Sequence, residues 1–229
     1  MKATDNRRSH MQSRIADAIK LASAPVAVLL TDRKPDKAIQ FKKEKWGCVG
    51  AMLVTASRRK GAVFDRETFG CVGGGVGLGF GNTYEGFPIE HLLSEGNLDD
   101  NNTDDPRPHV PGEHYLKTPE LACEFVDSLP MRDVATQFVV FKPLEQLNDN
   151  ETPETVVFLV NPDQLSALVV LAHYNRGGSQ SVISPWAAGC QSVLFGYAEA
   201  ERDQPRAVIG FFDITVRRLV PPDILTLTV

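Results

Sequence analysis

The chain has 229 residues, of which 42% are hydrophobic and 23% are charged, and its net charge is −5 at pH 7. These are the values of a globular protein that buries a core without disulfide bonds. They disfavour a nucleic-acid partner, which usually leaves a basic surface, and no apolar run approaches the roughly 20 residues that cross a bilayer.

The first part of the chain alternates between helix and strand patterns. Apolar residues at helical spacing over Met11–Ala22 predict an amphipathic helix. The continuous apolar run Val26–Leu30 predicts a buried strand. Small and apolar residues over Cys48–Ser57, followed by basic residues and a glycine, predict a second helix. Ala62–Phe64 then predicts a strand that leads into a glycine-rich loop.

The second part mixes the same two element types. The Asp-, Asn-, Pro- and Gly-rich segment Gly96–Gly112 predicts an exposed connector. A capping Thr118 before Pro119 and Glu120 predicts a helix start. Further elements are predicted as strands at Gln137–Phe141, Thr155–Val160 and Ala207–Phe212, as helices at Gln164–Tyr174 and Ala187–Leu194, and as a short helix or docked tail at Pro221–Leu225. The mixture, without an internal repeat, predicts a single mixed α/β domain over residues 1–229, with a central sheet flanked by helices.

The glycine-rich segment Phe69–Gly81 is the part of the chain best suited to carry chemistry. Seven of the twelve residues from Gly70 to Gly81 are glycine. Such a run either lets backbones pack closely or lets backbone N–H groups approach an anion or a cluster. The strict dinucleotide and Walker motifs are absent. The candidate ligand contacts in this segment are Gly73, Gly74, Gly75 and Gly77.

Three of the four cysteines share a local setting, because a glycine precedes each of Cys48, Cys71 and Cys190. Glycine leaves room around the sulfur and offers backbone donors, which a thiolate on a metal cluster needs. Cys123 differs, since it lies on a predicted helix, where core packing is the simpler role. As a fourth ligand Cys123 would complete a [4Fe–4S] set. Otherwise another residue, a small molecule or water takes that position, or Cys71 serves as a nucleophile.

The order of these motifs identifies a resemblance that runs from about Gln12 to Pro222. It is carried by Pro25–Val28 after an N-terminal helix, Cys48 with its helix, Cys71 with its glycines, Phe141–Leu144, Asn161–Leu165, and Cys190 after small residues. In these features the chain resembles domain-of-unknown-function family 169, the ArCR-type proteins of archaea and anaerobic bacteria. The resemblance implies a cytoplasmic protein from settings where oxygen is scarce, which suits an iron–sulfur cluster, and it implies no particular reaction.

Three hypotheses of function follow. The first is a protein that binds an iron–sulfur or other metal cluster through Cys48, Cys71, Cys190 and Cys123, and that acts in electron transfer or redox sensing. The second is a small-molecule binding protein or non-redox enzyme that holds an anionic ligand with the glycine segment and with Asn161 and Gln164. The third is a structural or interaction protein with core cysteines.

The expected cellular location and partners are the same for all three hypotheses. The N-terminus does not look like a secretory signal, so we expect a cytoplasmic protein with free thiols. We expect a redox partner protein or a small molecule as its partner, and neither a membrane nor a nucleic acid. The sequence assigns no catalytic residue and leaves homo-oligomerisation open.

Overall fold

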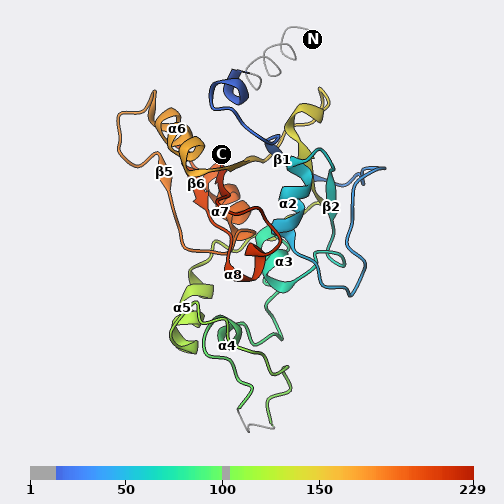
Figure 1. Ribbon diagram of the computed structural model, residues 1–229. Coiled ribbons are helices and arrows are strands. Elements are labelled where there is room, and N and C mark those ends of the chain that lie inside the picture. The colour runs from blue at the N-terminus through green and yellow to red at the C-terminus, as the bar shows by residue number, and fades with distance from the viewer. Residues whose placement is uncertain (1–13, 100–103) are drawn as a thin grey trace.

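The computed structural model describes residues 14–99 and 104–229 (Figure 1). In this part of the chain the backbone forms one seven-stranded sheet with the order β2-β3-β1-β4-β7-β6-β5 and with helices packed against it. The predicted mixed α/β class is therefore confirmed. The strands are β1 (Val26–Thr31), β2 (Ala62–Phe64), β3 (Phe138–Pro143), β4 (Thr155–Val160), β5 (Val182–Ile183), β6 (Ala207–Gly210) and β7 (Leu225–Thr228).

The sheet is antiparallel except at one edge, where β5 runs parallel to β6. Strand β1 lies near its centre, with Val28 opposite Phe141 of β3 and Val26 opposite Val157 of β4. Side chains alternate between the faces of a strand, so the unbroken apolar run of β1 means that both of its faces are covered. Val28 packs in the main core, and its neighbour Leu29 packs in a smaller cluster.

The described helices are α2 (Val49–Ser57), α3 (Val72–Leu78), α4 (Ile89–Leu93), α5 (Pro119–Ser128), α6 (Pro162–His173), α7 (Gln191–Ala200) and α8 (Ile214–Arg217), with a 3₁₀ turn η1 (Leu144–Gln146). Helices α2, α3 and α7 share the main core with the sheet through Leu53, Leu78 and Tyr197. Helix α6 covers another part of the sheet, where Leu168 packs with Phe158 and Leu227. Two helical layers thus enclose the sheet.

Helices α4 and α5 form a lobe away from the sheet, seen at the bottom of Figure 1. Their apolar side chains, including Leu92 and Phe125, still pack against the main core. The lobe therefore forms a wall beside the N-terminal ends of the core helices, where the cysteines lie.

Several predicted elements differ from the observed ones. The glycine-rich segment is not a loop but contains helix α3, and the C-terminal segment forms strand β7 between β4 and β6. Strand β5 carried no prediction, and α7 begins only at Gln191. Residues 14–18 of the predicted N-terminal helix are helical, and Met11–Ser13 lie outside the described residues.

Candidate functional site

Three cysteines each stand at the N-cap position of a helix. Cys48 precedes α2, and its Sγ accepts a hydrogen bond from the Ala51 N–H at 3.4 Å. Cys71 precedes α3, and its Sγ accepts from the Gly74 N–H at 3.3 Å. The first N–H groups of a helix have no partner within the helix, so a side chain at the N-cap can accept from them. Here sulfur takes the place usually held by oxygen.

Cys190 stands at the N-cap of α7 with a different contact. Its backbone is helical, and its Sγ donates to the Gly73 carbonyl oxygen of α3 at 3.3 Å and to Gln191 Oε1 of its own helix at 3.5 Å. The three thiols from α2, α3 and α7 line one cavity of about 460 Å³. The structure thus brings together the three cysteines that share a preceding glycine.

The glycines of α3 allow this approach. A Cβ on Gly77 would lie 2.5 Å from the Cys190 carbonyl oxygen, and one on Gly74 would lie 2.7 Å from Val49 Cγ2. Gly75 packs against Thr83, and Gly73 faces Gln191 and Tyr84 beside the cavity. Close packing of backbones is therefore the structural role of the run, and it seats α3 against both α2 and α7.

Burial dominates the electrostatics of the three thiols. Desolvation raises the pKa of Cys71 to about 11, although the Gly74 N–H lowers it in part. Burial raises the pKa of Cys48 in the same way, and it raises the pKa of the Cys190 thiol well above its usual value. Without a cation beside them, all three side chains are therefore neutral thiols at pH 7.

Two buried polar side chains, Tyr84 and Gln191, adjoin the thiols. Gln191 Nε2 donates to the Gly73 carbonyl oxygen and to the Tyr84 hydroxyl oxygen, both at 3.0 Å. Only 6% of Tyr84 and 3% of Gln191 is exposed. Neither residue was predicted, because a single tyrosine or glutamine carries no pattern in a sequence. Only Gln191 had a signal in the sequence, because it directly follows Cys190.

Aromatic side chains form other parts of the cavity lining. Phe125 and Trp186 meet edge to face with centroids 4.5 Å apart, and Tyr115 lies 5.8 Å from Trp186. Trp46 and Phe87 also line the cavity. Its acidic side chains are Glu113 and Asp213, and no described Lys, Arg or His lines it. The cavity combines three thiols with an apolar, aromatic enclosure.

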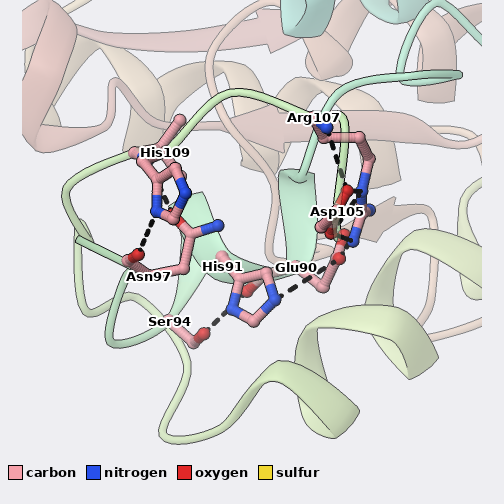
Figure 2. Close-up of polar contacts among 8 residues, drawn as sticks. Glu90, His91, Ser94, Asn97, Asp105, Arg107 and His109 are labelled. Carbon is pink, nitrogen blue, oxygen red and sulfur yellow. Dashed lines mark hydrogen bonds and ion pairs between the residues drawn. The ribbon is translucent and has the colours of Figure 1, made fainter. Parts of the chain in front are cut away.

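A polar network joins α4 to the segment that follows it (Figure 2). Arg107 bridges Glu90 at the start of α4, at 2.7 Å, and Asp105, at 2.9 Å. The Arg107 guanidinium holds the pKa of the Asp105 carboxyl at about 2. Asn97 Oδ1 accepts from the Val110 N–H at 2.7 Å. The described part of the predicted connector Gly96–Gly112 is therefore tied back onto α4, whose Ile89 and Leu92 line the cavity.

The remaining predicted residues lie elsewhere. Cys123 is exposed on α5 and does not line the cavity. Asn161 and Gln164 form a capping box at the start of α6, with the Asn161 side chain accepting from the Gln164 N–H at 2.9 Å. Gln164 Nε2 also donates to the Lys20 carbonyl oxygen at 2.8 Å. Their polar groups serve the helix end and are not part of the thiol cavity.

Two kinds of feature are absent from the described residues. In residues 14–99 and 104–229, no group of three or more His, Cys, Asp or Glu side chains is placed to hold a metal ion as it stands. No described helix has the length and hydropathy needed to cross a membrane.

The fold and the site define a mixed α/β protein with three thiols around one aromatic cavity. A family model described as the uncharacterised ArCR family DUF169 matches residues 14–229. The chain belongs to this family, as its order of motifs predicted. No curated protein and no solved structure matches the chain significantly.

Proposed function

We propose that Cys48, Cys71 and Cys190 bind an iron–sulfur cluster and that the protein works in electron transfer or redox sensing. The observation that carries this proposal is the convergence of three cysteines, from three separate helices, on one cavity. The proposal leaves Cys123 out of the ligand set, because Cys123 is exposed and does not line that cavity.

A cluster and a single ion ask for different spacings of their cysteine ligands. A single zinc ion gathers its cysteine sulfurs within about 2.3 Å of the metal, whereas the cysteines of a [4Fe–4S] cluster bind separate iron atoms and stand farther apart. No described group of side chains is placed to hold one ion. We therefore propose a cluster, and not a single ion, for the three thiols that line the cavity.

The protein offers these thiols what a cluster needs. Their raised pKa values mean that each must lose a proton on binding, which the positive charge of iron favours. The Ala51 and Gly74 N–H groups already point at Cys48 and Cys71 sulfur, and they would continue to donate to the thiolates. The partial positive charge at the N-termini of α2 and α7 acts in the same direction.

Three cysteines leave one position of a four-iron cluster without a cysteine ligand. Water or a small molecule in the cavity would supply the remaining ligand. Such a vacant position suits a protein that senses or binds a small molecule as well as one that only passes electrons.

Anaerobic reconstitution with ferrous iron and sulfide tests the proposal. We expect the wild-type protein to gain iron, acid-labile sulfide and absorbance at about 400 nm. Cys48→Ser, Cys71→Ser and Cys190→Ser should each lose most of this signal. Cys123→Ser is the matched control and should keep it. Loss of the cluster in the control, or full iron retention in all three site variants, would contradict the assignment.

A further inference from the structure

The cavity beside the thiols has a second set of features that the cluster does not use. We propose that it binds a neutral, largely apolar small molecule, about the size of two fused rings, whose acceptor oxygen takes a hydrogen bond from the Tyr84 hydroxyl. The proposal goes beyond cluster binding and does not require it, since it rests on Tyr84 and the aromatic walls.

The size and the walls of the cavity fit such a ligand. Its volume of about 460 Å³ lies within the range of small-molecule sites. The Phe125–Trp186 pair and Tyr115 form an aromatic wall, and Phe87 adds a further ring. Aromatic faces and edges favour contact with a flat ring over a flexible polar chain.

The charged side chains around the cavity disfavour an anion as the ligand. No described Lys, Arg or His lines it, so a phosphate or a carboxylate would enter an apolar space without a counter-ion. The glycine segment does not compensate, because the Gly74 N–H is already donated to Cys71 Sγ. The anionic ligand expected from the glycine run stays a competing prediction, which indane-2-carboxylate tests.

A cation is the competing ligand, because the carboxylates of Glu113 and Asp213 line the cavity, and 2-aminoindane tests it. The Asp213 side chain also caps α8 by accepting from the Val216 N–H at 3.1 Å. A neutral ligand is the type that the mostly apolar lining accommodates without burying a further charge.

Tyr84 supplies the polar contact. Because the Gly73 carbonyl oxygen can only accept, the amide nitrogen of Gln191 must face it, and the same nitrogen donates to the Tyr84 oxygen. Burial raises the pKa of Tyr84, so its hydroxyl keeps its proton. No acceptor for that proton is found within the described parts of the chain. A ligand oxygen in the cavity would satisfy this buried donor.

Four compounds share one ring system and differ in the acceptor oxygen and the charge: 1-indanone, indane, 2-aminoindane and indane-2-carboxylate. Comparing their affinities tests each feature of the proposed ligand separately. Both tryptophans of the chain, Trp46 and Trp186, line the cavity, so quenching of intrinsic fluorescence reports binding there. We expect 1-indanone to bind about three- to tenfold more tightly than indane, which is the worth of one buried hydrogen bond. The two charged compounds should bind more weakly than 1-indanone.

Tyr84→Phe keeps the ring and removes only the hydroxyl. It should leave the indane affinity unchanged and abolish the preference for 1-indanone, whereas Phe125→Ala should weaken both compounds. Equal binding of 1-indanone and indane by the wild-type protein would overturn the proposal without any variant. So would absence of binding, tighter binding of a charged compound, or an undiminished preference in Tyr84→Phe. Iron content measured on the same samples distinguishes this failure from failure of the cluster assignment.

Discussion

The four cysteines show how position decides what one residue type can do. Cys71 stands at a helix start inside a cavity, where burial raises its pKa to about 11. Cys123 has the same side chain on the outer face of α5 and is exposed. Reactivity of a thiol depends on its thiolate fraction and on access. The two residues should therefore be distinguishable in the folded protein without any mutation.

We predict that alkylation of metal-free protein by iodoacetamide modifies Cys123 before Cys71 at pH 7. The Cys71 rate should rise about tenfold per pH unit up to about pH 10, because its thiolate fraction grows throughout that interval, whereas an ordinary thiol levels off at about pH 8.5. Peptide mass spectrometry on timed samples measures both rates. A plateau for Cys71 below pH 9, or equal rates at pH 7, would contradict it.

The same raised pKa has a consequence for stability. The folded Cys71 binds its proton more tightly than the unfolded thiol does. Its contribution is therefore fully present below about pH 8.5 and is lost as the pH rises through about 11.

At the level of helices and strands, the sequence was informative where local chemistry decides the structure. Thr118 before Pro119 predicted the start of α5, and the apolar run in β4 predicted that strand. The sequence-based prediction failed where tertiary packing decides the structure. In β7, Thr226 and Thr228 are fully buried; Thr226 packs beside Gly210 of the neighbouring strand β6, and Thr228 packs beside Gly196 of helix α7. Buried threonines resemble surface residues in a sequence, so this strand was missed.

Helix α3 is the other case in which packing overrides local preference. Glycine disfavours a helix by about 1 kcal/mol relative to alanine, so a glycine run predicts a loop. The gain from seating α3 against α2 and α7 outweighs that cost, because only glycine fits at Gly77 beside the Cys190 carbonyl. The convergence of the three cysteines depends on this tertiary packing, and no spacing in the sequence reveals it.

Gly77→Ala tests the packing of α3. Alanine would gain about 1 kcal/mol of helix propensity, but its Cβ would lie 2.5 Å from a backbone oxygen that cannot easily move. We expect a net loss of about 1–2 kcal/mol in the free energy of unfolding, since overpacking costs about 1–3 kcal/mol. Urea unfolding measures the change. Gly177→Ala is the control, because nothing lies within 4 Å of that Cβ, and it should cause no loss. Equal stability of both variants would refute the packing role.

Across the whole molecule, the sheet joins segments from both ends of the chain. The C-terminal strand β7 lies between β4 and β6, and β6 carries the edge strand β5. Backbone hydrogen bonds extend the pairing to the last residue, since the Val229 N–H donates to the Val156 carbonyl oxygen at 3.0 Å. The β6–β5 edge is thus attached to the rest of the sheet through the last strand of the chain.

Removal of residues 225–229 should therefore abolish cooperative folding. The loss would detach β5 and β6 from β4 and leave two unpaired strand edges, which promote aggregation. Near-ultraviolet circular dichroism and a thermal melt measure the outcome, and we expect neither a native signal nor a sharp transition. A two-residue Gly-Ser insertion after Gly177 is the control, because that glycine is exposed with open space around it, and such sites tolerate insertion. A truncated chain that melts cooperatively at the wild-type temperature would show that β7 is dispensable. In that case the packing of α2, α3 and α7 would hold the thiol cavity together without the complete sheet beneath them.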